Sequence, residues 1–228
     1  AREYPQGKKW IVTESVFSMD GDRCDLQGVI ELKKRYGAML WLDEAHAVGM
    51  IGPEGRGLAA KLDIENEIEV QMGTLGKAVG ASGGYLAGSR VLIDFLINRA
   101  RSFIFSTAPP AAVAAAALAG VELLSGEEGE QRRRRLWKNL HLFGKGISLP
   151  EKAMPVSAIV PIMIGDEGKT LQMAERLWRA GFWLPAVRYP TVAKGAARLR
   201  ISLSASHSKE NVQALISMLK EVSASENQ

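Results

Sequence analysis

Residues 39–46 read Met39-Leu40-Trp41-Leu42-Asp43-Glu44-Ala45-His46, and this stretch decides the fold class. Its first four residues are all apolar, which is typical of a short strand that is buried on both faces of a parallel sheet. Two carboxylates follow the strand directly. Because ligands of open α/β sheets bind beyond the carboxyl ends of the strands, Asp43 stands where a functional residue is expected.

Short apolar runs and helix-like segments alternate on both sides of this strand. We predict strands at residues 10–13, 39–42, 68–72 and 84–87, and helices at residues 26–36, 91–100 and 111–124. Gly37 follows the first helix as a stop signal. Strands that alternate with helices indicate an α/β domain with a mainly parallel sheet.

Ser125 and Gly126 open a charged stretch, and we place a domain boundary there, between residues 1–125 and a smaller α+β domain at residues 126–228. In the smaller domain we predict helices at residues 131–143, 170–180 and 209–222, and strands at residues 158–164, 182–187 and 197–204. The periodicity of the middle helix predicts one apolar face made of Leu171, Ala174, Leu177 and Trp178.

The composition is that of an ordinary globular protein. Hydrophobic residues make up 46% of the 228, and no apolar run reaches the roughly 18 residues of a membrane span. The single cysteine, Cys24, fits a reducing compartment, so we expect a cytoplasmic protein. No Cys/His cluster has zinc-like spacing, so no metal is expected. The net charge of +4 and the basic run at residues 132–135, which follows acidic residues, do not indicate a nucleic-acid partner.

The sequence Asp43-Glu44-Ala45-His46 is open to two interpretations. In the first, it is the acidic box of a nucleotide hydrolase, in which a carboxylate at a strand end holds magnesium. That interpretation needs an upstream phosphate loop of the form G-x-x-x-x-G-K-[ST], and the 228 residues contain none. In the second, Asp43 works together with a lysine about 30 residues further along the chain.

That lysine is Lys77, in the run Met72-Gly73-Thr74-Leu75-Gly76-Lys77-Ala78-Val79-Gly80. The small residues around it would let a bulky planar ligand approach the backbone. An aldehyde cofactor needs an amine that binds it covalently, and a carboxylate that keeps its ring nitrogen protonated. Lys77 and Asp43 could supply these two groups. A lone lysine is more often a solvated surface residue, but surface lysines rarely need such glycine-rich neighbours.

Four stretches together resemble one family, the α-oxoamine synthases, which are a branch of the fold-type I pyridoxal-phosphate enzymes. They are residues 12–22 (VTESVFSMDGD), 42–49 (LDEAHAVG), 52–57 (GPEGRG) and 73–77 (GTLGK). The resemblance implies pyridoxal 5'-phosphate as the cofactor and a homodimer as the assembly. It also implies that residues 1–125 are the C-terminal part of the cofactor-binding domain.

The resemblance further implies a role for each matched residue. Lys77 would carry the cofactor and move the α-proton of the substrate, while Asp43 would pair with the ring nitrogen. Further cofactor contacts would come from His46 and Ser18 at the ring hydroxyl, from Thr74 at the phosphate, and from Ser106 and Thr107 at the phosphate in the neighbouring subunit. Ser106 and Thr107 could equally cap the helix that begins after Pro109 and Pro110.

The segment at residues 187–202 resembles the part of these enzymes that faces the substrate. Leu199 and Ile201 alternate with Arg198 and Arg200, so one face of this strand is apolar and the other holds two arginines. Without the resemblance, an exposed strand face would be the simplest interpretation. The resemblance implies that Arg200 grips the carboxylate of an amino acid, with Thr191 near the substrate. Arg198 would remain a structural or surface residue.

The resemblance therefore implies an acyltransferase that acts on small molecules. The stretches at residues 164–166 and 189–200 most resemble a branch of the family, and that resemblance implies decarboxylative condensation of L-alanine with a pimeloyl thioester, a step of biotin biosynthesis. Two alternatives stay open: a sister enzyme that uses glycine, and a non-catalytic accessory subunit of the same fold. Members of the family are nearly twice as long, and the glycine-rich turn and the ring-stacking residue that they carry have no counterpart here. We therefore expect this chain to be part of a longer protein.

Overall fold

A computed structural model of the chain describes residues 6–224. The chain forms two compact units. Residues up to Val16 and residues Cys24–Glu130 make the first unit, whereas Phe17–Arg23 and the residues from Gln131 onward make the second. The chain therefore passes from one unit to the other after Val16, again after Arg23 and again after Glu130. That residues 1–125 are the C-terminal part of a cofactor-binding domain and residues 126–228 a small C-terminal domain stays a prediction.

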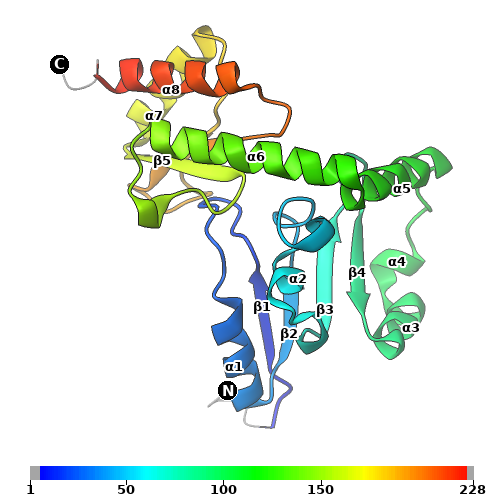
Figure 1. The fold of residues 1–228 in the computed structure, drawn as a ribbon. Helices are drawn as coiled ribbons and strands as arrows, with labels where there is room; N and C mark the ends of the chain where they lie inside the picture. Colours follow the sequence, from blue (N-terminus) through cyan, green and yellow to red (C-terminus); the bar gives the residue numbers. More distant parts are fainter. Residues whose placement is uncertain (1–5, 225–228) are drawn as a thin grey trace. The chain divides into compact units, whose positions relative to one another are not determined.

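The first unit is an α/β sheet of four strands, drawn side by side in Figure 1. The strands β1 (Trp10–Glu14), β2 (Met39–Asp43) and β3 (Val70–Thr74) run parallel, and β4 (Gly84–Gly88) pairs antiparallel with β3 at the edge. The prediction of a mainly parallel α/β sheet is confirmed. The antiparallel edge strand was not foreseen, and it places the lysine on a connection between two neighbouring strands.

Helices and short 3₁₀ turns connect these strands. They are α1 (Leu26–Tyr36), η1 (Pro53–Gly55), α2 (Leu58–Leu62), η2 (Glu65–Glu67), α3 (Arg90–Arg99), α4 (Arg101–Ile104) and α5 (Ala111–Ser125). Asp25 caps α1 by accepting a hydrogen bond from the backbone N–H of Gly28, and Gly37 ends the helix in the left-handed conformation. The core of this unit is built from the fully buried Leu40 and Leu42 of β2 and from apolar residues of α1 and α2.

The helices α3, α4 and α5 contrast with α1 and α2, because none of their residues is buried. Large apolar side chains on and next to them are open to solvent, including Val91, Phe95, Phe103, Phe105 and Leu118. A helix that is apolar all round, as α5 is, normally lies in a protein interior. This surface is therefore unusually apolar for the outside of a globular protein.

The second unit is α+β, as predicted. Its sheet has the strand order β5-β7-β6, with β5 (Ile159–Gly165) and β6 (Ala186–Val187) each antiparallel to the central β7 (Ala197–Ser202). Its other elements are α6 (Glu127–Gly146), which starts at the end of the first unit, η3 (Glu151–Ala153), α7 (Glu167–Arg179) and α8 (Lys209–Ala224).

Two details of the second unit differ from the sequence prediction. The strand expected at residues 182–187 is reduced to its last two residues, because Pro185 lacks the N–H that a strand needs to continue pairing. The apolar face of α7 is also shifted. The helix buries Thr170, Met173 and Leu177, while Leu171 and Trp178 are exposed.

Candidate active site

Asp43 ends β2 at the carboxyl edge of the parallel strands, in register with Met72 of β3. The backbone continues this pairing for one more residue, because the N–H of Glu44 donates to the carbonyl of Met72 at 2.8 Å. One carboxylate oxygen of Asp43 then accepts from the backbone N–H of Ala45 at 2.7 Å. This bond holds the carboxylate at the start of the turn that carries His46.

Lys77 lies on a closed loop between β3 and β4. The loop is tied at its base by the hydrogen bond from the N–H of Leu75 to the carbonyl of Gly83, at 2.9 Å. The hydroxyl of Thr74 donates to the same carbonyl at 3.2 Å and accepts from the N–H of Gly76 at 3.1 Å. The loop is thus braced from within by Thr74, while the side chain of Lys77 is exposed.

The loop and the turn after β2 touch each other. A Cβ atom on Gly49 would lie only 2.3 Å from the Cβ of Ala78, so the methyl group of Ala78 packs directly against the backbone of Gly49. His46 is half-buried on the same turn. The structure therefore brings Asp43, His46, Thr74 and Lys77 to one edge of the sheet, as expected for residues that share a site.

A buried carboxyl that the sequence analysis left without a role lies beneath this edge. Glu44 accepts hydrogen bonds from the hydroxyl of Ser15 at 2.6 Å and from the backbone N–H groups of Leu58 and Ala59 at 3.1 and 2.8 Å. Burial raises the pKa of Glu44, and these three donors only partly offset the effect of burial. Glu44 thereby ties the ends of β1 and β2 to the start of α2.

Tyr85 is a second neighbour of the site that sequence reasoning missed. Its ring packs over Gly73, because a Cβ there would come within 2.4 Å of the phenol oxygen. Burial raises the pKa of Tyr85, and the negative charges of Glu44 and Asp43 raise it further. The position of Tyr85 follows from the antiparallel pairing of β4, which the sequence did not reveal.

Ser18, Thr191 and Arg200 belong to the second unit. Arg200 donates from Nε to the carbonyl of Ser18 at 2.7 Å and from Nη1 to the hydroxyl of Ser202 at 2.9 Å. Burial lowers the pKa of Arg200, and no carboxylate among residues 6–224 forms an ion pair with it. Thr191 is exposed on the turn after β6. Ser18 and Arg200 are thus in direct contact, and Thr191 is not part of this contact.

Ser106 and Thr107 lie exposed on the connection between α4 and α5. The alternative that they cap α5 is wrong, because the N-cap of that helix is Pro110 and no side chain bonds there. The hydroxyl of Ser106 instead donates to the carbonyl of Ser102. Among residues 6–224, no hydrogen bond joins either residue to Lys77, and their contact with a neighbouring subunit's cofactor stays a prediction.

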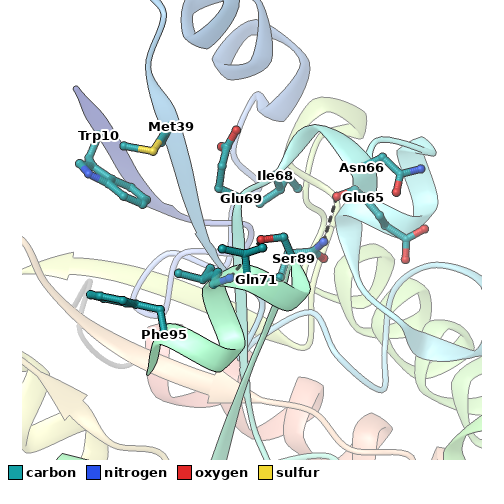
Figure 2. A pocket seen from close by; sticks show the side chains of 12 residues that line it. Trp10, Met39, Glu65, Asn66, Ile68, Glu69, Gln71, Ser89 and Phe95 are labelled. Atoms are coloured by element: carbon teal, nitrogen blue, oxygen red, sulfur yellow. Dashed lines mark hydrogen bonds between the residues drawn. The ribbon is translucent and has the colours of Figure 1, made fainter. Parts of the chain in front are cut away.

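The first unit also contains a hollow of about 790 Å³, shown in Figure 2. Trp10 and Met39, the first residues of β1 and β2, line it together with Gln71 and Phe95, and Gln71 donates to the carbonyl of Glu65 at 3.1 Å. Because Trp10 and Met39 start their strands, this hollow lies at the sheet edge opposite Asp43. It is therefore separate from the Lys77 site.

Within the described part of the chain, no group of three or more His, Cys, Asp or Glu side chains is arranged to hold a metal ion. Across residues 6–224, none of the helices has the length and apolar character that crossing a membrane requires.

Comparisons with known proteins agree with this geometry. The chain is 43% identical over 221 residues to an 8-amino-7-oxononanoate synthase of Trichlorobacter lovleyi. The aligned region covers 95% of this chain and 56% of the relative. It is 46% identical over 219 residues to the enzyme of that name from Acidithiobacillus ferrooxidans, with the same coverage. The chain thus spans a little more than half the length of these curated relatives.

The fold is also similar to that of solved structures. A serine palmitoyltransferase from S. paucimobilis, determined with a bound PLP–myriocin aldimine, superimposes with a TM-score of 0.91 at 29% identity. The match covers 97% of this chain and 56% of that one. An 8-amino-7-oxononanoate synthase from Francisella tularensis superimposes with a TM-score of 0.80 at 27% identity, covering 98% of this chain and 67% of that one.

The family pattern of the class I and II aminotransferases matches residues 1–219, which is nearly the whole chain. The same residues contain the parallel sheet, the strand-end aspartate and the lysine loop described above. The chain therefore belongs to the aminotransferase class I and II family.

Proposed function

We propose that this chain is part of an 8-amino-7-oxononanoate synthase, a pyridoxal-phosphate-dependent acyltransferase that condenses L-alanine with a pimeloyl thioester and releases carbon dioxide. The observation that carries the proposal is the meeting of the Asp43 turn with the Lys77 loop through Gly49 and Ala78. The 43–46% identity to synthases of this name supports the choice within the family.

The donor groups of the first unit fit pyridoxal phosphate. Lys77 offers an exposed primary amine on a loop of small residues, which suits covalent attachment of an aldehyde. Asp43 uses one oxygen to accept from Ala45 and keeps its second oxygen for a protonated ring nitrogen. His46 would bond the ring hydroxyl, and Thr74 would support the phosphate. The family resemblance gives Ser18, a residue of the second unit, the same role as His46.

When bound, pyridoxal phosphate supplies an electron sink that stabilises negative charge at the α-carbon of the amino acid. Lys77 would hold the cofactor through Nζ and, once the substrate's amine has replaced it, would remove and return the proton at the α-carbon. Asp43 would keep the ring nitrogen charged throughout. By holding the proton from the α-carbon, Lys77 would let that carbon bond to the thioester carbonyl as the thiol leaves. Once the carboxylate of the amino acid has left as carbon dioxide, Lys77 would return a proton to the same carbon.

Arg200 would bind the carboxylate of the amino acid. Its guanidinium is half-buried without an ion-pair partner among residues 6–224, and a desolvated cation of this kind is stabilised by an anionic ligand. A guanidinium can also grip a carboxylate with two parallel hydrogen bonds. Thr191, exposed on the turn after β6, would lie near the bound substrate.

We further propose that the enzyme is a cytoplasmic homodimer. The uncovered apolar side chains of α3, α4 and α5 form a surface that a second subunit could bury. Ser106 and Thr107 lie between α4 and α5, so a partner that covers these helices would also meet the two hydroxyl groups. The molecular mass measured by light scattering tests this proposal, and a monomeric mass in the complete protein would contradict it.

The test of the proposed reaction is a thiol-release assay on the complete natural protein. L-alanine or glycine is offered with pimeloyl, acetyl and succinyl thioesters, and the visible absorbance of lysine-bound cofactor is recorded. We expect absorbance and turnover with alanine and the pimeloyl thioester. Both should be lost in Lys77→Ala and kept in Lys61→Ala, a matched change of an exposed lysine.

The other outcomes separate the alternatives. Turnover with glycine in place of alanine would move the protein to a sister enzyme of the family. Absorbance without turnover on any of these substrates would contradict the proposed reaction. A protein that binds no cofactor would be the non-catalytic accessory subunit, although the presence of Lys77, Asp43 and Arg200 speaks against that role.

A further inference from the structure

Residues 17–23 form a segment that belongs to the second unit, although the residues on both sides of it belong to the first. The segment is closed by two backbone hydrogen bonds, from the N–H of Phe17 to the carbonyl of Asp22 at 3.0 Å and from the N–H of Gly21 to the carbonyl of Phe17 at 2.9 Å. It carries Ser18, one of the residues of the proposed site.

Two arginines of β7 hold this segment. Arg198 and Arg200 are two residues apart on the strand and therefore point to the same face of the sheet. Arg200 donates from Nε to the carbonyl of Ser18 at 2.7 Å, and Nη1 of Arg198 forms an ion pair with the carboxylate of Asp20. The two acceptors, on Ser18 and Asp20, are two residues apart in sequence, as the two arginines are. The ion pair thus sets the register of the segment against β7.

The ion pair is not an ordinary surface contact. The side chain of Arg198 is only 7% exposed, whereas that of Asp20 is 54% exposed. Arg198 also donates from Nε to the carbonyl of Ala196 at 3.1 Å, so its guanidinium is held from two sides. Removing the carboxylate would leave a nearly buried cation without its counter-charge, which costs more than the loss of an exposed pair.

The far end of the segment is fixed as well. Gly21 has a φ of +71°, and a Cβ atom there would lie 2.2 Å from the carbonyl oxygen of Ile159, so the segment lies directly on β5. Arg23 donates from Nε to the carbonyl of Val156 at 2.9 Å and lies over the ring of Trp137 at 5.7 Å. The segment therefore has one position on the sheet.

We infer that Asp20 and Arg198 are positioning residues for the carboxylate of the amino-acid substrate, acting through the 17–23 segment and Arg200. The inference rests on the proposed function, in which Arg200 binds that carboxylate. Nε of Arg200 is held by Ser18, and Nη1 donates one N–H to the hydroxyl of Ser202. The remaining N–H groups of Nη1 and Nη2 form the edge at which a carboxylate can accept two hydrogen bonds.

Loss of the ion pair would leave the segment held only at its far end, by Gly21 and Arg23, and would loosen the Ser18 carbonyl that orients Arg200. The arginine would then sample several rotamers and would have to be ordered by each substrate molecule, at a cost in affinity. The chemical step would be unaffected, because neither Asp20 nor Arg198 touches a reacting atom in this scheme. The acyl thioester should bind as before.

Asp20→Ala in the complete enzyme tests this inference, and its free energy of unfolding is measured alongside, because the change leaves the nearly buried Arg198 without its counter-charge. We expect the KM for the amino acid to rise about tenfold, while kcat and the KM for the thioester stay within about twofold. Asp20→Glu, which keeps the charge, should recover most of the affinity. Glu175→Gln is the matched control, because it breaks the exposed pair with Arg179 in the same unit.

A second readout does not depend on activity. Amide hydrogen exchange in the peptide that covers residues 17–23 should be faster in Asp20→Ala and unchanged in Asp20→Glu and Glu175→Gln. Unchanged exchange together with an unchanged KM would overturn the inference. So would equal losses in kcat and in both KM values, because these would indicate general destabilisation.

A failure of the proposed function would look different. The unmodified enzyme would then show no turnover with any amino acid, and the substrate role of the ion pair would fall with it. Faster exchange in Asp20→Ala would still be observed in that case, because it depends only on the contacts between the segment and β7.

Discussion

The hydroxyl of Ser15 donates a 2.6 Å hydrogen bond to the buried carboxyl of Glu44. Ser15 follows β1 and Glu44 follows β2, so this bond joins the carboxyl ends of two parallel strands directly beside Asp43. Two backbone N–H groups at the start of α2 complete the set of donors around the carboxyl. The position of Asp43 therefore depends on a neighbour that has no part in the proposed chemistry.

Replacing Glu44 should destabilise the protein. Glu44→Ala leaves two buried backbone N–H groups without an acceptor and leaves the Ser15 hydroxyl with only its 3.2 Å bond to the carbonyl of Asp43. We expect a loss of about 2–4 kcal/mol in the free energy of unfolding. Urea denaturation followed by circular dichroism measures this loss. Glu31→Ala, which removes an exposed carboxylate on α1, is the control and should change stability little. Equal stability of both variants would contradict the assigned role of Glu44.

Glu69 should make the free energy of unfolding depend on pH in the acid range. Burial alone would raise its pKa, but the hydrogen bond and charge of Lys33, 2.8 Å away, and the N–H of Leu40 together lower the pKa below the ordinary 4.5. A group whose folded pKa is lowered stabilises the fold above its unfolded pKa, and this contribution disappears as the pH falls through the folded value.

The stability difference between the unmodified protein and Glu69→Gln should therefore be largest at neutral pH and should vanish in acid. Urea midpoints measured from about pH 7 to about pH 3 test this expectation. Glu67→Gln, which breaks the more exposed pair with Lys34, should show a smaller effect. A stability difference that grows towards acid pH would contradict the expectation that folding lowers the pKa of Glu69.

Asp43→Asn should reduce turnover while leaving the fold intact. Asparagine can still accept the hydrogen bond from Ala45, but it cannot hold a positive charge on the ring nitrogen. We expect kcat to fall about 100-fold, as when a preorganised electrostatic contact is removed from an active site. Asp63→Asn is a suitable control, because Asp63 is an exposed cap residue of α2 in a left-handed conformation that asparagine tolerates. Equal kcat values in the two variants would argue against the site.

Arg200→Lys should affect the amino acid and not the thioester. Lysine keeps the positive charge but cannot bond Ser18 and a carboxylate at the same time through a planar fork. We expect the KM for alanine to rise at least about tenfold, with the KM for the thioester nearly constant. The same change at Arg179, which is exposed on α7, should leave both values as they were. A larger change in the KM for the thioester would assign Arg200 to the other substrate.

Much of the first unit was predictable because its periodicity is strong. The apolar run from Met39 and the glycine after Tyr36 gave β2 and the end of α1 with correct bounds to within a residue. The direction of β4 was not predictable, since the connection around Lys77, residues 75–83, has the composition of either a crossover or a hairpin. The predicted helix at residues 131–143 starts earlier, at Glu127, because acidic residues favour the first turn of a helix.

The site was predictable only in part. The residues near Asp43 and Lys77 lie in short motifs, so the sequence alone could point to them. The burial of Arg198 could not be foreseen, because its partner Asp20 is 178 residues away and no local pattern links them. Similarly, Leu171 and Trp178 have the spacing of a buried helix face, but tertiary packing buries the neighbouring face of α7 instead.

The passage of residues 17–23 into the second unit has a consequence for how the protein is made. The segment leaves the ribosome long before β5 and β7, the strands on which it lies, have been synthesised. Its native contacts must therefore wait until nearly the whole chain is available, and contacts of such long sequence separation form slowly. For the same reason, a gene fragment that starts at residue 131 would yield a second unit that lacks the segment and the acceptor of Arg200.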